Sequence, residues 1–362
     1  MARNSGAAVG TPMRKVMLIH AGSIPHYRCA VYSYLSTYLA QRGYALCLLA
    51  EGIENGGPQE LRFRLEQRKL TVRSILDRAS AIRPESVILF TGLRSLWLFP
   101  VLAALKVSGI KVVYWGHGIN LQKKDSLRSV YSLYHELCDA IILYGEHLRR
   151  YIRARLQSKV FVANNTLNTN ELPAISRPKR EILNEHGIGT TKNIICVGRL
   201  QRRKRVEHLL DAFLKLNSNE FGLILVGPDP EGLLTSMDHP RIFKMGPLYG
   251  KPAYELLYAS DVCCIPGAVG LSIVDGFYYG LPLVTEDVDH GPEIMYLKNG
   301  LNGYIVPAGD IEALAEGVRE LLDDEGKRRL FSVHAKETIM REGHIDRLCQ
   351  GFEKALNYVH DA

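Results

Sequence analysis

Residues 193–206 read NIICVGRLQRRKRV, and this stretch decides the fold. Residues 194–197 are apolar and run into Gly198, which is typical of a buried strand that ends in a turn. The apolar residues that follow recur at the spacing of one helical face: Val206, Leu209, Leu210, Phe213 and Leu216. The stretch therefore predicts a strand, a tight turn and a helix that begins near Lys204.

The turn between this strand and helix is strongly basic, because five of the seven residues 199–205 are cationic. A helix N-terminus is the positive end of the helix dipole, so cations cluster there at a cost unless an anion lies among them. Arginine offers a forked donor set that suits phosphate, and lysine acts as a point charge. We therefore expect Arg199 and Lys204 to bind phosphate, with Gly198 in the same site. We expect two of the three remaining arginines to face solvent.

A second glycine-containing turn lies in residues 264–284, which read CIPGAVGLSIVDGFYYGLPLV. Gly267 and Gly270 let the backbone approach a ligand closely. The backbone amides near Gly270 and Leu271 would lie at the N-terminus of a short helix, where they could bind an anion. Asp275 follows about one helical turn later, and its carboxylate can accept two hydrogen bonds from the vicinal hydroxyls of a ribose. The alternative for Asp275 is a partly buried helix residue with a local partner.

Short apolar runs alternate with helical patterns along both halves of the chain, which indicates parallel α/β sheets. The predicted strands are 16–20, 45–50, 86–90, 111–115, 140–143 and 159–162, followed by 193–197, 222–226, 242–245, 262–265, 283–285 and 303–306. We predict two Rossmann-like domains that face a central cleft. The first domain is 1–170, a linker is 171–190, the second domain is 191–345, and a C-terminal helix at 346–362 packs back on the first domain.

Composition agrees with two globular domains, since the chain has 362 residues, 46% hydrophobic and 23% charged. No apolar run has the length of a membrane span, and no secretory signal is evident. The seven cysteines have no regular spacing, which favours buried, reduced thiols in a cytoplasmic protein.

Charge is divided unevenly, with a net charge of +13 over residues 1–178 and −6 over the remainder. A basic first half favours an anionic partner, and solvated helix faces are the alternative. An anionic membrane surface is the partner we expect. Nucleic acid is not expected, because the basic residues are scattered and form no recognition motif.

The second half of the chain resembles a known family across about residues 190–310. The residues that carry the resemblance are Val197-Gly-Arg-Leu with Lys204, Gly227-Pro-Asp229, Ala259-Ser-Asp261, Gly270-Leu271, Asp275, Gly280-Leu-Pro282 and Gly291-Pro-Glu293. In order and spacing they resemble the C-terminal half of glycosyltransferase family four, the retaining enzymes of GT-B fold. The first half resembles the family less closely, through Ile24-Pro-His-Tyr-Arg28 and Trp115-Gly-His-Gly118.

The resemblance implies a donor site in the second domain. Arg199 and Lys204 would hold the diphosphate of a nucleotide sugar such as a UDP- or GDP-sugar. Asp275 would hold the ribose, and Gly270 and Leu271 would offer backbone amides. The cations would stabilise the leaving group in place of a metal, so no metal or other cofactor is expected.

The family also implies the reaction and its setting. The product would retain the donor's anomeric configuration, and the acceptor would be a saccharide or lipid-linked saccharide in surface polysaccharide assembly. The expected location is the cytoplasm, peripheral to the inner face of the membrane.

Residues of the first domain would line the other side of the cleft. We expect His117, at a strand end between two glycines, to contact the donor sugar or the acceptor hydroxyl, against a structural histidine. His26, Tyr27 and Arg28 follow the first strand and would line the acceptor side; a helix-capping turn with a core tyrosine is the alternative. Gly22 would let the loop approach the donor phosphates.

One position departs from the family, which has two glutamates eight positions apart in this segment. The second corresponds to Asp275, and the first falls on Gly267, which has no side chain. Gly267 therefore favours one alternative, an inactive nucleotide-sugar-binding scaffold. A nucleotide-sugar epimerase of the same two-domain build is another alternative, and it would need acid/base carboxylates in the cleft.

Two other motifs are weak. Residues 246–251 read GPLYGK, one residue short of a P-loop. Asp287 and Asp289, with Glu286 and His290 nearby, leave a metal site as a minor alternative.

Overall fold

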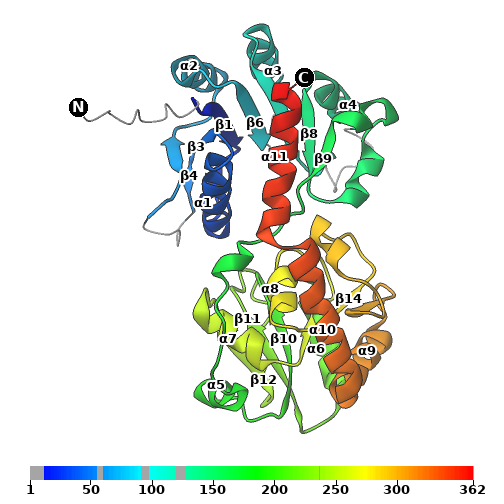
Figure 1. Ribbon diagram of the computed structural model, residues 1–362. Helices are drawn as coiled ribbons and strands as arrows, with labels where there is room; N and C mark the ends of the chain where they lie inside the picture. The colour runs from blue at the N-terminus through cyan, green and yellow to red at the C-terminus, as the bar shows by residue number, and fades with distance from the viewer. Residues whose placement is uncertain (1–11, 55–59, 91–97, 120–127, 236, 362) are drawn as a thin grey trace, which may run out of the picture. The chain divides into compact units, whose positions relative to one another are not determined.

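The computed structural model describes residues 12–54, 60–90, 98–119, 128–235 and 237–361. The chain divides into two compact units (Figure 1). One unit comprises Met1–Ala163 together with Cys349–Ala362, and the other comprises Asn164–Leu348. The second unit is thus one continuous segment, and the first is built from both ends of the chain.

The first unit is built on a parallel sheet of seven strands in the order β5-β3-β1-β6-β7-β8-β9. The strands are β1 (Arg14–His20), β3 (Tyr44–Ala50), β5 (Arg64–Gln67), β6 (Ser86–Phe90), β7 (Lys111–Gly116), β8 (Ala140–Leu143) and β9 (Val160–Val162). A separate two-stranded sheet pairs β2 (Ser23–Ile24) with β4 (Gly52–Ile53). The central strands are buried along most of their length, as expected for strands covered on both faces.

Helices and short 3₁₀ turns connect these strands. They are α1 (His26–Ala40), α2 (Val72–Ile82), α3 (Leu98–Val107), α4 (Arg128–Leu137), η1 (Glu146–Tyr151) and η2 (Ala154–Lys159). The chain returns to this unit in α11 (Ile345–Asp361). There Phe352 packs edge-on against Trp115, the ring centroids 4.7 Å apart, and Glu353 accepts a hydrogen bond of 2.7 Å from the Tyr38 hydroxyl.

The second unit is built on a parallel sheet of six strands in the order β12-β11-β10-β13-β14-β15. The strands are β10 (Lys192–Val197), β11 (Phe221–Val226), β12 (Ile242–Gly246), β13 (Val262–Cys264), β14 (Leu283–Glu286) and β15 (Gly303–Val306). From β10 the chain adds β11 and β12 on one side of the sheet, and then β13, β14 and β15 on the other. The strand order therefore reverses between β10 and β13. In open α/β sheets ligands bind beyond the carboxyl ends of the strands at this point.

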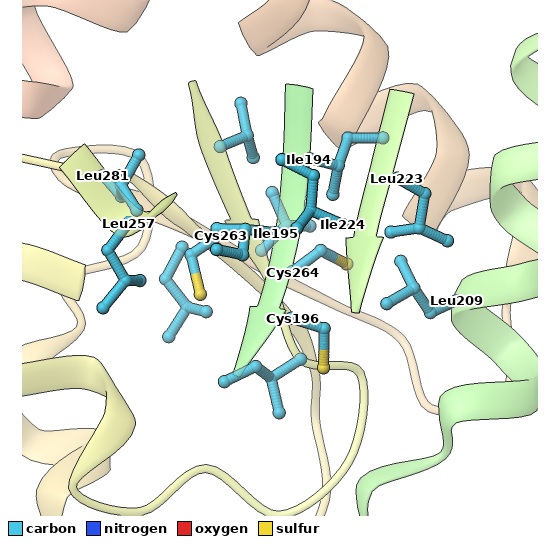
Figure 2. Packing of buried hydrophobic residues seen from close by; sticks show 14 of the residues in the cluster. Ile194, Ile195, Cys196, Leu209, Leu223, Ile224, Leu257, Cys263, Cys264 and Leu281 are labelled. Carbon is cyan, nitrogen blue, oxygen red and sulfur yellow. The ribbon is translucent and has the colours of Figure 1, made fainter. Parts of the chain in front are cut away.

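Helices lie on both sides of this sheet (Figure 1). They are α5 (Lys179–Glu185), α6 (Val206–Leu216), α7 (Lys251–Ala259), α8 (Ser272–Tyr278), α9 (Ile311–Asp323) and α10 (Glu325–Glu342), with 3₁₀ turns η3 (Thr169–Glu171), η4 (Arg202–Lys204) and η5 (Pro292–Tyr296). Figure 2 shows the strand side chains between Leu209 of α6 on one side and Leu257 of α7 on the other. Ile194, Ile195 and Leu223 are fully inaccessible at the centre of this core.

The two parallel α/β sheets confirm the predicted fold class. The predicted helix near Lys204 was placed two residues early, because η4 and a left-handed residue, Arg205, come before α6 begins at Val206. Sequence patterns missed β5, whose residues RLEQ form a polar edge strand.

All seven cysteines are buried and none is in a disulfide, as the sequence predicted. Burial raises the pKa of the thiols of Cys196, Cys263 and Cys264, so they remain protonated. In the part of the chain that the structure describes, no helix has the length and apolar character needed to cross a bilayer.

Candidate donor site

Three loops of the second unit meet at one edge of its sheet. They follow β10, β13 and β14, which are neighbours in the sheet and run parallel. Parallel strands bring their carboxyl ends to one edge, so residues 198–205, 265–271 and 287–291 lie at the same end of the unit. Most of the residues predicted for the second domain's site are in the first two loops.

Lys204 is the central cation of this site. The residue is 5% exposed, and no described residue accepts a hydrogen bond from its ammonium or forms an ion pair with it. Burial lowers the pKa of Lys204, and the positive charge of Arg203 acts in the same direction. A buried ammonium is expensive unless an anion compensates it. The ammonium is therefore placed to take up an anion at the carboxyl end of β10.

Gly198 leaves room for the side chain of Lys204. Its backbone has a φ of 121°, in the region that favours glycine, and a Cβ there would lie 3.2 Å from Lys204 Cε. The lysine stem thus occupies the space that a side chain at residue 198 would fill. Arg199 follows, exposed to solvent, and no ion pair to it exists among the described residues.

The other three arginines of the turn are engaged within the protein. The Arg202 guanidinium lies 3.7 Å from Glu231, and Arg203 donates to the side-chain oxygen of Gln201 at 3.2 Å. Arg205 forms an ion pair with Glu286. Arg202 and Arg203 are exposed, as predicted for two of the three. Arg205 is half-buried.

The loop after β13 is joined to the lysine turn through the backbone. The amide of Gly267 donates to Lys204 O at 2.9 Å, and the amide of Ala268 donates to Arg203 O at 2.8 Å. A Cβ at residue 267 would lie 2.3 Å from Arg203 O, closer than packing allows. Gly267 therefore lets the two loops lie in direct contact, and any side chain there would separate them.

Asp275 and the two residues before α8 present unused polar groups. Asp275 Oδ1 is buried and has no hydrogen-bond partner among the described residues. Desolvation raises the pKa of this carboxyl from 3.8 to about 7. The amides of Gly270 and Leu271 make no hydrogen bond within the described chain, so they remain available as donors. A ligand with hydroxyls and anionic oxygens would satisfy both kinds of group.

His290 fixes the backbone of this loop. Its Nδ1 accepts from the amide of Val269 at 3.1 Å, and its Nε2 lies 2.8 Å from Glu286 O. Because Nδ1 accepts from an amide, the ring proton is on Nε2, which donates to the carbonyl oxygen. Burial lowers the pKa of His290, which favours this neutral form. Sequence reasoning did not assign this role, which depends on two backbone contacts.

The minor metal alternative at Glu286, Asp287, Asp289 and His290 is not supported. Both ring nitrogens of His290 are engaged by the backbone, and the Glu286 carboxylate is held by Arg205 and His208. Among the described residues no group of three or more His, Cys, Asp or Glu side chains is arranged to hold a metal ion.

The first unit has its own cluster of polar groups at the carboxyl ends of its strands. Arg28 of α1 is 5% exposed and donates to the Tyr144 hydroxyl at 2.9 Å. Its guanidinium carbon lies 5.1 Å from the ring centroids of both Phe90 and Trp115. His117 packs edge-on against Tyr144, with 4.8 Å between the centroids. The sequence-predicted Arg28 and His117 thus share one neighbour.

Two histidines of this cluster are held neutral. Burial and the charge of Arg28 lower the pKa of His117 to about 4 and that of His20 to about 3. His20 ends β1, and its Nδ1 lies 2.8 Å from the Tyr32 hydroxyl. Sequence reasoning missed His20 because a histidine that ends an apolar strand gives no signal distinct from the core.

The other predicted residues of the first unit lie around the start of α1. Gly22, with a φ of 81°, forms the turn after β1. His26 is the first residue of α1, and its ring packs edge-on against that of Tyr27, with centroids 5.6 Å apart. The first turn of the helix contains the whole His26–Arg28 segment, in which Arg28 is buried and Tyr27 is exposed.

The fold of this chain is similar to that of solved glycosyltransferases. HepE of Anabaena, solved in complex with UDP, superposes on this chain with a TM-score of 0.77 at 16% identity, over 95% of this chain and 100% of that one. The architecture is that of the GT-B glycosyltransferases.

The sequence comparison finds a similar family for part of the chain. Residues 191–324 match the profile of the family described as glycosyl transferases group 1. The matched segment contains the donor-site loops and lies within the second unit.

Two curated relatives match parts of the chain. An exopolysaccharide phosphotransferase of Streptomyces coelicolor is 25% identical over 213 residues, 55% of this chain and 21% of that relative. A phosphatidyl-myo-inositol mannosyltransferase of Mycobacterium leprae is 27% identical over 220 residues, 58% of this chain and 56% of that relative. The aligned regions thus span about a fifth and about half of those two proteins.

Proposed function

We propose that this protein is a retaining glycosyltransferase that moves a sugar from a nucleotide diphosphate, such as a UDP- or GDP-sugar, to a saccharide or lipid-linked saccharide. The observation that carries the proposal is the buried ammonium of Lys204, which lacks an anionic partner among the described residues. Its position beyond β10, at the point where strand order reverses, is where a phosphate ligand is expected.

The proposed reaction needs stabilisation of a leaving group. The bond between the anomeric carbon and the diphosphate oxygen breaks, and the acceptor oxygen forms a new bond to that carbon. The acceptor proton passes to the departing phosphate. Lys204 and Arg199 stabilise the negative charge that develops on the diphosphate, together with the amides of Gly270 and Leu271. Asp275 binds the ribose hydroxyls through its unpartnered oxygen.

The cluster in the first unit is proposed to serve the other substrates. With a pKa of about 4, the His117 imidazole is neutral near pH 7 and can accept a hydrogen bond from a sugar or acceptor hydroxyl. His26, Tyr27 and Arg28 are proposed on the acceptor side, and Gly22 near the donor phosphates. The uneven charge of the chain supports a further proposal, docking to an anionic membrane surface during polysaccharide assembly in the cytoplasm.

Lys204→Met tests the donor site. This change removes the ammonium and keeps a stem of similar volume, and we expect UDP or GDP to bind about 10- to 100-fold more weakly, since a hydrogen bond to a charged group contributes about 1.5–3 kcal/mol. Binding is measured by titration calorimetry. Lys251→Met, on the exposed surface of α7, is the matched control and should bind as the wild type does. Equal affinity in wild type and Lys204→Met would contradict the proposal.

A nucleotide-sugar-binding protein without turnover is the second candidate. It is favoured by one observation: Gly267 stands where the family resemblance places a sugar-contacting glutamate, and the backbone of Arg203 fills the space beside it. Release of UDP or GDP from the corresponding sugar nucleotide separates the two functions. Release that depends on an added acceptor supports the transferase, and binding without release supports the second candidate.

A further inference from the structure

The residue after Lys204 has an unusual backbone. Arg205 adopts the left-handed conformation, with φ 51° and ψ 47°, and it joins the end of η4 to the start of α6. Residues with a Cβ rarely adopt this conformation, because the side chain crowds the backbone. The turn that presents Lys204 therefore depends on a residue whose intrinsic preference opposes it.

A buried carboxylate holds that residue in place. Glu286 is the last residue of β14, its side chain is fully inaccessible, and it forms an ion pair with the Arg205 guanidinium. The same carboxylate lies 2.6 Å from His208 Nδ1 and accepts from the amide of Gly309 at 2.7 Å. Burial raises the pKa of Glu286, but these three donors outweigh burial and lower it. The carboxylate is thus ionised and ties α6, β14 and the turn before α9 together.

The ion pair between Glu286 and Arg205, here called the anchor, holds one side of the lysine turn, residues 202–205. The loop after β13 holds the other side. Gly267 and Ala268 donate to the carbonyl oxygens of Lys204 and Arg203. These backbone hydrogen bonds fix the position of Arg203 and Lys204 relative to the loop after β13. The ion pair to Glu286 fixes the conformation of Arg205, which follows them. Neither Arg205 nor Glu286 needs to touch the ligand for this to matter.

We propose that Glu286 is a positioning residue: through Arg205 it holds the left-handed turn that presents the Lys204 ammonium to the donor diphosphate. This inference rests on the proposed function, since it takes Lys204 as the phosphate ligand. It explains why an arginine, rather than a residue without a side chain, is tolerated at a left-handed position beside the site.

Substitutions at residue 205 distinguish this role from general stability. Arg205→Gly removes the anchor but also removes the need for it, because glycine adopts the left-handed conformation freely. Arg205→Ala removes the anchor and keeps the Cβ that opposes the turn. We expect UDP or GDP to bind to Arg205→Gly within about 3-fold of wild type and to Arg205→Ala about 10-fold more weakly.

Glu286→Gln completes the test. It should weaken binding of the same diphosphate about 10-fold, and adding Arg205→Gly should restore most of that loss. Glu312→Gln removes an exposed ion pair at the far end of α6, to Lys215, and should leave binding unchanged. Affinity is measured by calorimetry, and the unfolding temperature of each ligand-free variant is recorded beside it. If Glu286→Gln does not fold, the Arg205→Gly and Arg205→Ala pair decides.

The outcomes distinguish failure of the positioning role from failure of the proposed donor site. If Lys204→Met loses binding while Arg205→Ala and Arg205→Gly bind alike, the positioning role is wrong and the donor site stands. If Lys204→Met binds as the wild type does, or the wild type binds neither diphosphate, the donor-site assignment fails and this inference fails with it. Weaker binding by Arg205→Ala alone, with rescue of Glu286→Gln by Arg205→Gly, supports the positioning role.

Discussion

At the scale of single residues, Lys204 and Asp275 respond to burial in opposite directions. Desolvation lowers the pKa of the lysine and raises that of the aspartate, so in each case the neutral form gains. A diphosphate beside the ammonium and hydroxyls beside the carboxylate would reverse both effects. In the ligand-free protein the charged forms of Lys204 and Asp275 are therefore less stable than they would be beside a bound nucleotide.

Asp275 gives a prediction about stability and pH. Its pKa is about 7 in the folded chain and near 3.8 when unfolded, so the folded state retains a proton that the unfolded state releases between these values. The stability that this proton confers is complete below the unfolded pKa and is lost as pH rises through about 7. Asp275→Asn cannot ionise, so its unfolding temperature should fall less than that of wild type between about pH 4.5 and pH 8.5.

The comparison needs a carboxylate without this environment. Asp211 lies on the exposed face of α6, and Asp211→Asn is the control for removal of a carboxylate at the surface. Differential scanning fluorimetry across the pH range supplies the measurement. Parallel curves for wild type and Asp275→Asn would show that the carboxyl is not desolvated.

At the scale of elements, the site depends on how closely two loops approach. Gly267→Ala places a methyl group 2.3 Å from Arg203 O, so the loop after β13 must move away from the lysine turn. We expect a loss of about 1–3 kcal/mol in the free energy of unfolding, as for overpacked cores, together with weaker binding of UDP or GDP.

A glycine without near neighbours serves as the control for this change. No heavy atom lies within 4 Å of a Cβ built at Gly189, so Gly189→Ala should be close to neutral. Chemical denaturation compares the two variants. A Gly267→Ala protein as stable as wild type would mean that the loops are not in the contact described.

Sequence patterns predicted the elements better than the contacts between them. Strands such as β10 and β11 contain continuous apolar runs, so their bounds were predicted within one residue. Lys204 was predicted as an anion ligand because cations cluster there. The link between Arg205 and Glu286 was missed, because the two residues are 81 positions apart and a left-handed arginine has no sequence signature.

At the scale of the whole molecule, the chain path interleaves the two units. The second unit is an uninterrupted segment, whereas the first is completed by residues after Leu348. Within the first unit, Phe352 is fully inaccessible against Trp115, and Gly351 lies where a Cβ would be 2.3 Å from Val162 O. The end of α11 therefore belongs to the core of the first unit.

Phe352→Ala should reveal this division. Truncation of a buried phenylalanine costs about 3–5 kcal/mol, and the loss should fall on the first unit. Hydrogen exchange should show faster exchange in β1, β7 and β8, with β10 and β11 unchanged. Phe277→Ala, in the buried core of the second unit, should give the opposite pattern. Faster exchange in both units from either change would indicate a single cooperative core.

The inaccessibility of every native thiol has a practical consequence. Alkylating reagents and maleimide dyes should leave the folded protein largely unmodified, because all seven cysteines are buried, and burial raises the pKa of thiols such as those of Cys138 and Cys196. A single cysteine added at an exposed site, such as Val107→Cys at the end of α3, would then carry all of the fluorophore. Spectroscopic probes can be attached to this enzyme candidate one at a time, without first removing any native residue.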